Sequence, residues 1–324
     1  MRYRKLGRTG FEISEIGYGA WGISGSQWIG ARDDESRQAL HRAIDLGLNF
    51  IDTALAYGDG HSEKLVGEIV RERSERIYVA SKVPPRNMLW PAQLGIPLGR
   101  VFPYDYIVGC VDRSLKHLNI ETLDLMQFHV WNPEWNKQDD WKRAIEDSKR
   151  SGKVRHFGIS INDYQPDSAL ETLRLGLIDA VQVIYNVFDP RAQDRLFPLC
   201  RELDIGVIAR VPLDEGGLTG MITPETTFPS GDFRNRYFKD DRKRQVFDRV
   251  RKLQRDVGES HGTVAEVALR FCLSTPDVST VIPGMRKVRH AEANMAVSDK
   301  GPLPPDVLAK LEEHRWIRNF YDRG

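Results

Sequence analysis

Four polar residues in the first 130 positions are of types that together can move a proton. Asp52 ends the run LNFID, Tyr57 follows in AYGDG, Lys82 ends YVASK, and His129 ends LDLMQFH. A tyrosine, with a pKa of about 10, is a weak acid at neutral pH. A lysine beside it favours the phenolate, an aspartate holds that lysine, and a histidine orients a carbonyl oxygen. The set predicts a general acid for carbonyl reduction, with a nicotinamide supplying the hydride.

Each of these residues also has a structural interpretation when taken alone. Asp52 stands before a threonine and could cap a helix or form a turn, Lys82 could be a solvated charge, and His129 could be an interior histidine. The catalytic hypothesis depends on whether the fold brings the four together.

The pattern around them alternates short apolar runs with longer amphipathic ones. Strands are expected at residues 16–19, 48–52, 76–81, 123–129, 153–159, 179–184, 206–210 and 279–282. Helices are expected at 33–46, 61–73, 104–118, 138–150, 166–175, 190–203, 240–257, 263–274, 287–297 and 305–315. Eight strand–helix units predict an α/β fold, a (β/α)8 TIM barrel formed by residues 1–324 as a single domain. Its N-terminal stretch is expected to form a β-hairpin at the barrel bottom, and extra helices are expected at its C-terminal end.

Asp52, Lys82 and His129 fall at the C-terminal ends of three successive expected strands, and Tyr57 lies in the loop after the first of them. In a barrel these ends converge on one mouth, where barrel enzymes keep their sites. Three long segments, 83–103, 130–137 and 212–239, follow strands and belong to the same rim.

Residues 17–22, Gly-Tyr-Gly-Ala-Trp-Gly, match the pattern GxGxxG. A Rossmann dinucleotide site needs a helix that opens at the third glycine. The residues that follow, ISGSQWIGA, are typical of a loop. We therefore interpret this segment as a tight turn whose glycines permit close backbone approach.

The composition argues against several other classes of protein. The net charge is +1, so no nucleic-acid or membrane partner is expected. The basic segment 239–258 interleaves acids and reads as a barrel-packing helix rather than a nucleic-acid site. Three scattered cysteines favour a reducing compartment, no zinc-ligand spacing is present, and no signal peptide or membrane helix is visible, so a cytoplasmic location is expected.

The segment GLNFIDTALAYG at 47–58, followed by Ser62, Glu63 and Gly67, resembles the first signature of the aldo-keto reductase superfamily. Further segments follow in the family's order: LDLMQFH at 123–129, GIS at 158–160, VQVIYN at 181–186, VPL at 211–213 and IPG at 282–284. The resemblance implies a (β/α)8 barrel that binds NADP(H) without a Rossmann fold. It also implies Tyr57 as proton donor, Lys82 and Asp52 as its tuning pair, and His129 as the residue that orients the substrate.

The same resemblance implies a cofactor shell that includes Asp52. The implied residues are Gly19, Ala20, Trp21, Ser160, Gln182, Pro212, Leu213, Leu218, Gly220, Ile282, Gly284, Arg286, His290 and Asn294. The family's asparagine after the serine is Ile161 here, and Asn162 is the candidate substitute. Arg210 stands where many members stack an aromatic ring on the nicotinamide, and it either stacks there or pairs with an acid on the rim.

Basic residues gather where the resemblance places the 2′-phosphate. Arg286, Lys287, Arg289 and His290 lie at the start of an expected helix, whose N-terminus attracts phosphate. We therefore expect NADP (NADPH) as the cofactor, with NAD as the alternative. An ordinary basic helix face is the competing interpretation.

The substrate is expected to be a small-molecule aldehyde or ketone. Tryptophans at 21, 28, 90, 131 and 135 fall in expected rim loops, where they either wall an apolar pocket or pin the loops. We expect the pocket at Trp21, Tyr57, His129 and Trp131. The rival function is a cofactor-binding regulatory subunit of the same fold without catalysis. The sequence predicts neither the physiological substrate nor the oligomeric state.

Overall fold

The computed structural model describes residues 1–319 and 321, and within them eight parallel strands form one curled sheet. In sheet order the strands are β3 (Tyr18–Gly19), β4 (Phe50–Asp52), β5 (Tyr78–Val83), β6 (Leu123–Phe128), β7 (Val154–Ser160), β8 (Ala180–Ile184), β9 (Gly206–Arg210) and β10 (Thr280–Val281). Each strand pairs with its neighbour along the chain. A parallel bridge from Ile16 to Val281 joins the first strand to the last. The predicted (β/α)8 barrel is confirmed.

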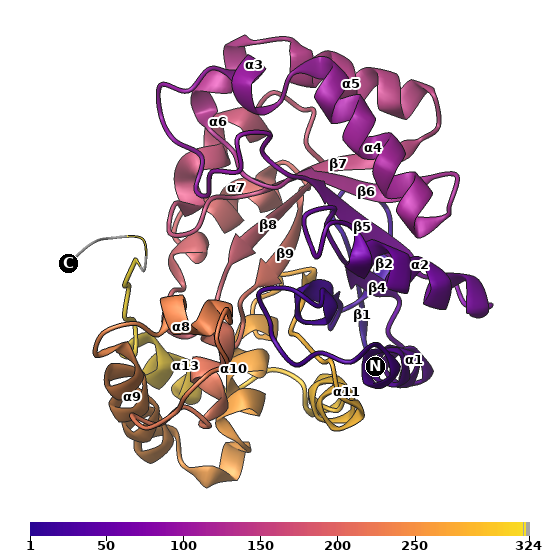
Figure 1. Ribbon diagram of the computed structural model, residues 1–324. Helices are drawn as coiled ribbons and strands as arrows, with labels where there is room; N and C mark the ends of the chain where they lie inside the picture. The colour runs from indigo at the N-terminus through magenta and orange to yellow at the C-terminus, as the bar shows by residue number, and fades with distance from the viewer. Residues whose placement is uncertain (320, 322–324) are drawn as a thin grey trace.

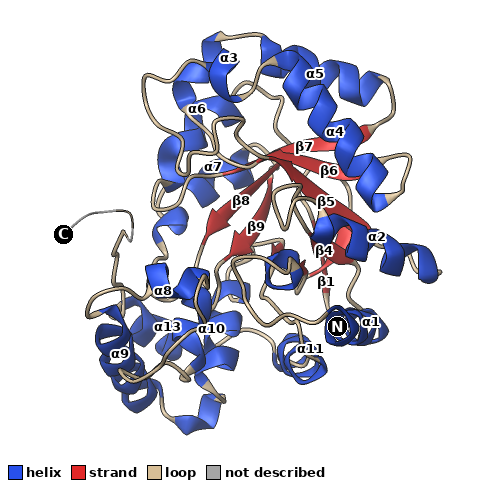
Figure 2. Ribbon diagram, viewed as in Figure 1, coloured by secondary structure: helices blue, strands red, loops and turns tan. Residues whose placement is uncertain are grey.

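Helices surround the strands, as Figures 1 and 2 show. The longer ones are α1 (Asp33–Asp45), α2 (His61–Glu72), α4 (Tyr104–Leu118), α5 (Asp140–Arg150), α7 (Leu196–Glu202), α9 (Arg242–Val257), α10 (Val264–Leu273), α11 (Val288–Met295) and α13 (Pro305–Glu312). The shorter ones are α3 (Leu98–Val101), α6 (Leu170–Leu173), α8 (Phe233–Tyr237) and α12 (Val297–Lys300). Helix α9 buries Val246, Val250, Leu253 and Val257, so the expected apolar face is present. The elements that it mainly contacts are α13 and the 3₁₀ stretch Asp214–Thr219, rather than the barrel strands.

Two helices differ from the expected ranges. The segment 166–175 begins as a 3₁₀ turn, Pro166–Ala169, before α6. The segment 190–203 is divided into the 3₁₀ turn Arg191–Gln193 and helix α7, which starts at Leu196. Pro198 has no backbone N–H, so it cannot bond the carbonyl of Asp194 four residues earlier. The helix therefore cannot extend back through that turn with regular bonding.

The predicted N-terminal hairpin is present and closes one end of the barrel. Strands β1 (Tyr3–Lys5) and β2 (Glu12–Ser14) pair antiparallel. Leu6 and Ile13 are fully buried in the apolar cluster inside the strands. Gly7 has a φ of +46°, and a Cβ there would lie 2.3 Å from the backbone nitrogen of Gly206. The close contact between the hairpin and β9 therefore requires a glycine.

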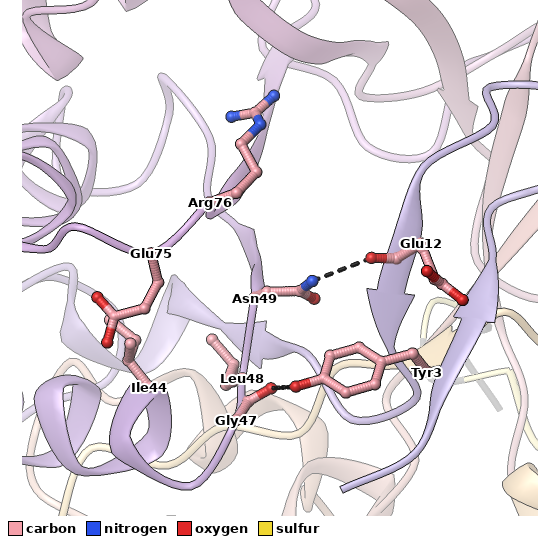
Figure 3. Close-up of a pocket in the computed structure, with 8 residues that line it drawn as sticks. All are labelled: Tyr3, Glu12, Ile44, Gly47, Leu48, Asn49, Glu75 and Arg76. Carbon is pink, nitrogen blue, oxygen red and sulfur yellow. Dashed lines mark hydrogen bonds between the residues drawn. The ribbon is translucent and has the colours of Figure 1, made fainter.

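A surface hollow of about 300 Å³ lies beside this hairpin (Figure 3). Its lining includes Tyr3, whose hydroxyl donates to the carbonyl of Gly47 at 2.9 Å. Asn49 donates to the carbonyl of Glu12 at 3.0 Å. Asn49 comes directly before β4, whereas Asp52 ends that strand. The hollow is therefore at the opposite end of the barrel from the predicted chemistry.

The rim segments are ordered and bonded to one another rather than free loops. The side chain of Asn132 donates to the carbonyl of Gln93 at 2.9 Å, and the indole of Trp135 donates to Ile96 at 2.8 Å. The segment 212–239 contains the 3₁₀ stretch Asp214–Thr219 and helix α8. The segments after β5 and β6 thus form one wall of the mouth.

Candidate active site

The fold brings the four predicted residues together at the mouth. Asp52 ends β4, Tyr57 lies in the turn that follows, Lys82 is the penultimate residue of β5, and His129 comes directly after β6. Asp52 pairs in register with Ala80 on β5, and Lys82 pairs with Gln127 on β6. Because neighbouring strands run in parallel, their ends meet at the same edge.

Lys82 is the centre of this group. Its ammonium donates to Oδ2 of Asp52 at 2.5 Å, to the carbonyl of Thr53 at 2.8 Å and to the hydroxyl of Tyr57 at 3.4 Å. An ammonium has three donors, so all of them are used. The rings of Tyr57 and His129 lie 5.8 Å apart. Lys82 and Asp52 are buried, whereas Tyr57 and His129 are half-buried at the opening.

The electrostatics of Tyr57 differ from the expectation based on the lysine alone. Burial raises the pKa of Tyr57 well above 10, and the negative charge of Asp52 raises it further. Arg210 opposes this shift. The expected lowering of the Tyr57 pKa is therefore wrong, because the desolvation of a phenolate outweighs the effect of the nearby cations. Tyr57 consequently keeps its proton at neutral pH.

Burial also shifts the pKa values of the two basic residues, Lys82 and His129. It lowers the pKa of Lys82, while the charge and hydrogen bond of Asp52 act in the opposite direction. The pKa of His129 is lowered well below 6.5 by burial and by the cations Lys82 and Arg210. His129 is therefore a neutral imidazole. Its Nδ1 is buried without a hydrogen-bond partner among the described residues.

The second oxygen of Asp52 is held by Gln182 and by Gln127, which was not among the residues expected at this site. Oδ1 accepts from Nε2 of Gln127 at 3.0 Å and from Nε2 of Gln182 at 2.7 Å. Gln127 precedes His129 by two positions, and side chains two apart on a strand share a face. That spacing from His129 is the signal that could have identified it.

Arg210 ends β9 and crosses toward the loop after β7. It forms an ion pair with Asp163 and donates to the carbonyl of Ile161 at 2.9 Å. Asp163 also accepts from the hydroxyl of Tyr321 at 2.8 Å. Of the two alternatives, pairing with an acid on the rim is thus present. The guanidinium still influences the mouth, since its charge acts on Tyr57, Lys82 and His129.

The side chain of Asn162 is hydrogen-bonded within the rim. Its Oδ1 accepts from the backbone N–H groups of Ala92 and Trp131, each at 3.2 Å. Its Nδ2 donates to the carbonyl of Trp131 at 2.8 Å and to Gln165 at 2.9 Å. Two acceptor and two donor positions are the full capacity of an amide. Asn162 therefore joins the rim loops, and we do not include it among the cofactor contacts.

The tryptophans divide into two groups. Trp21 lies 6.2 Å from the ring of Tyr57, and Trp90 lies 5.8 Å from the ring of His129. Trp131 is fully buried, packs 5.0 Å from Trp141, and donates its indole N–H to Thr172 at 2.7 Å. Trp131 is thus a core residue, and its expected place in the pocket is corrected. Trp90, rather than Trp131, stands beside the histidine.

The other residues that the resemblance assigned to a cofactor lie on or near this rim. Gly19 ends β3, and Ala20 and Trp21 begin the 3₁₀ turn Ala20–Ile23, so GxGxxG leads into no long helix. Ser160 ends β7, and Gln182 lies within β8. The others follow β9 and β10: Pro212, Leu213, Leu218, Gly220, Ile282, Gly284, Arg286, His290 and Asn294.

The basic residues Arg286, Lys287, Arg289 and His290 have few acidic partners among the described residues. Arg286 donates to the carbonyl of Ile29 at 3.2 Å, and Lys287 is 4.0 Å from Glu35. Burial lowers the pKa of His290, and the cations Arg289, Lys287 and Arg286 lower it further. Like charges held together in this way favour an anionic ligand.

Two other kinds of site are not found in the described residues. Residues 1–319 and 321 contain no group of three or more His, Cys, Asp or Glu side chains placed to hold a metal ion. No helix in this part of the chain has the length and apolar character needed to cross a membrane.

Comparison with known proteins agrees with this geometry. A model of the Aldo/keto reductase family matches residues 15–315. The aldo-keto reductase YhdN of Bacillus subtilis (strain 168) is 30% identical over 299 residues, which are 90% of this chain and 87% of that protein. The NADH-specific methylglyoxal reductase of Escherichia coli (strain K12) is 27% identical over 310 residues, covering 91% and 93% of the two chains.

A solved structure shares the fold along the whole chain. The holo form of the aldo-keto reductase AKR11C1 from Bacillus halodurans superposes with a TM-score of 0.78 at 24% identity. The match covers 99% of this chain and all of that one. On the family match and these relatives, the chain belongs to the aldo/keto reductase family and is an oxidoreductase that acts on carbonyl and alcohol groups.

Proposed function

We propose that the protein reduces a small aldehyde or ketone to an alcohol, with Tyr57 as the general acid and NADPH as the reductant. The observation that carries this proposal is the Lys82 ammonium, which is shared between the carboxylate of Asp52 and the hydroxyl of Tyr57. When bound, the nicotinamide supplies the hydride that reduces the carbonyl carbon.

The residues of the chain supply the proton. The oxygen of Tyr57 accepts from Lys82, so its own O–H remains available to donate to a carbonyl oxygen. As the proton leaves, the ammonium 3.4 Å away stabilises the phenolate. Neutral His129 donates a second hydrogen bond to the same oxygen and fixes its orientation. The rings of Trp21 and Trp90 give the opening apolar walls suited to an aryl or alkyl group.

The proposed cofactor contacts follow the rim. Ser160 and the outward oxygen of Gln182 would hold the carboxamide, and the backbone of Gly19, Ala20 and Trp21 and the segment 212–220 would approach the phosphates. Arg286 and His290 would hold the 2′-phosphate, because their neighbours leave excess positive charge there. Asn294 would meet the adenine.

Substitution of the acid tests the function. We expect Tyr57→Phe to retain NADPH affinity and to lose about 10²–10⁴-fold in turnover, the usual contribution of a positioned acid. The measurement is NADPH oxidation over a panel of aldehydes and ketones, with binding followed by fluorescence. Full activity in Tyr57→Phe would remove the proposed role. Tight NADPH binding with no turnover by the unchanged protein on any substrate would instead favour a regulatory, non-catalytic function.

Cofactor choice needs its own measurement, because one relative is named as NADH-specific. We expect NADPH to bind at least about tenfold more tightly than NADH, the effect of one charge-assisted hydrogen bond. The Arg286→Ala variant should lose most of this difference while leaving NADH affinity nearly unchanged. Equal binding of the two cofactors by the unchanged protein would overturn the preference.

A further inference from the structure

A pair of buried amides lies behind the proposed acid. Nε2 of Gln127 and Nε2 of Gln182 both donate to Oδ1 of Asp52, and Gln182 also donates to Oε1 of Gln127 at 3.2 Å. Gln127 is fully buried, and Asp52 and Gln182 are each 2% exposed. We infer that Gln127 is a positioning residue: it fixes Asp52 against Lys82 and holds Gln182 with its amide oxygen outward. This inference rests on the proposed function.

The direction of these hydrogen bonds follows from their chemistry. A carboxylate only accepts, so the nitrogen of each amide, and not its oxygen, must face Asp52. The two hydrogens on Nε2 of Gln182 are then both used, one by Asp52 and one by Gln127. Its oxygen is left as an acceptor. A ligand amide can therefore donate to Gln182 without displacing either inner hydrogen bond.

The position of Gln127 explains why it can act on the acid without touching a substrate. It pairs in register with Lys82 across β5 and β6, and it contacts the oxygen of Asp52 that Lys82 leaves free. With Oδ2 on Lys82 and Oδ1 on two amides, the carboxylate cannot rotate without breaking a charged hydrogen bond. Asp52 in turn sets where the ammonium lies relative to Tyr57.

Two variants of similar size separate positioning from simple packing. Gln127→Met removes the donor and the acceptor while keeping the volume, and we expect about a tenfold loss in kcat, the effect of one hydrogen bond to a charged group. NADPH affinity should change less than about threefold, since Asp52 still orients Gln182.

Gln127→Glu provides the rescue. A glutamic acid can donate to Asp52 only while it is protonated, and its ionised form places two carboxylates together. Activity should therefore fall at neutral and alkaline pH and recover as the pH is lowered. A purely structural role predicts that the loss in Gln127→Glu does not depend on pH.

The matched control is Gln193→Met. Gln193 also makes two side-chain hydrogen bonds, accepting from the hydroxyl of Tyr185 and donating to Glu312, but it does not touch Asp52. It should retain the unchanged kcat and pH profile. If Gln127→Met matches this control while Tyr57→Phe is inactive, the positioning role is wrong and the proposed function stands. If Tyr57→Phe is active, the proposed function itself fails.

Discussion

At the scale of single residues, the segment after β9 has an unusual backbone. Val211, Asp214 and Glu215 have φ values of 55°, 48° and 53°, which place three side-chain-bearing residues in the left-handed region. For a β-branched valine this conformation is strained. Asp214 is held by an ion pair with Arg242 at 3.0 Å and by the hydroxyl of Tyr237. The neighbouring Glu215 is half-buried beside these charges.

Glu215 gives a prediction about pH and stability. Burial raises the pKa of Glu215 from 4.5 to about 8, and the charges of Asp214 and Asp163 add to this effect. The folded state therefore binds more protons than the unfolded state between pH 4.5 and about 8, and stability falls as pH rises through that range. If Glu215 were completely shielded from solvent, this pKa shift would change the free energy of unfolding by about 5 kcal/mol. Because Glu215 is only half-buried, we expect about 1–2 kcal/mol.

The Glu215→Gln variant isolates this contribution. It should match the unchanged protein near pH 5 and be more stable near pH 8.5, by about 2–4 °C in Tm. Thermal unfolding at the two pH values measures the difference, with the exposed Glu121→Gln as the control. A difference that is the same at both pH values would show that the Glu215 carboxyl does not carry it.

Residue types pointed to the proposed active site but not to the neighbours that support it. Asp52, Lys82 and His129 were predictable because each follows an apolar run that must be a strand. Gln127 shares a strand face with His129 by its two-residue spacing, but that spacing does not reveal a contact with Asp52 on another strand. Trp131 was misplaced for a related reason: a tryptophan two residues after a strand fits the rim or the core equally well. Contacts between strands decide such cases, and they are not local in sequence.

At the scale of elements, Asn162 connects segments that follow three different strands. It bonds Ala92 after β5, Trp131 after β6 and Gln165 after β7. Side chains beside the mouth depend on this connection, since Trp90 lies two residues from Ala92 and contacts His129. The rim segments on this side of the mouth are consequently held together as one wall.

Removal of the Asn162 amide should loosen the rim segments after β5 and β6 without disturbing Tyr57, the proposed acid. We expect Asn162→Ala to lose about 2–4 kcal/mol of stability, because buried backbone groups of Trp131 and Ala92 lose their partners. KM should rise more than kcat falls. Hydrogen exchange should accelerate at residues 88–96 and 130–135.

The exposed Asn235 provides a comparison, since among the described residues its side chain bonds only the carbonyl of Pro229. Asn235→Ala should leave exchange in both segments unchanged. If Asn162→Ala also leaves exchange in these segments unchanged, Asn162 does not hold them together.

Element boundaries were predictable where periodicity was strong, as in α4, which spans the expected residues 104–118. They were less so where a proline or a short 3₁₀ turn interrupts a helix, as at Pro166 and Pro198. The order of the strands in the closed sheet follows from alternation of strands and helices. The hydrogen bonds between rim loops do not, because they depend on the curvature of the sheet.

At the scale of the whole molecule, the barrel is closed by contacts between distant parts of the chain. Val281 accepts from Gly17 and donates to the carbonyl of Glu15, both at 2.9 Å. The side chain of Glu15 accepts from Ser298 at 2.8 Å, and the backbone N–H of Arg2 donates to the same serine at 2.8 Å. The hairpin at the barrel bottom is therefore fastened to the last strand and the helices after it.

This closure has a consequence for synthesis on the ribosome. The first strand of the eight-stranded sheet closes, through the bridge at Ile16, on the last strand, so β3 and β9 keep unpaired edges until residue 281 has emerged. Exposed strand edges recruit other chains. The barrel therefore cannot close until β10 has left the exit tunnel, and protection of the free strand edges by a chaperone would matter most just before that point.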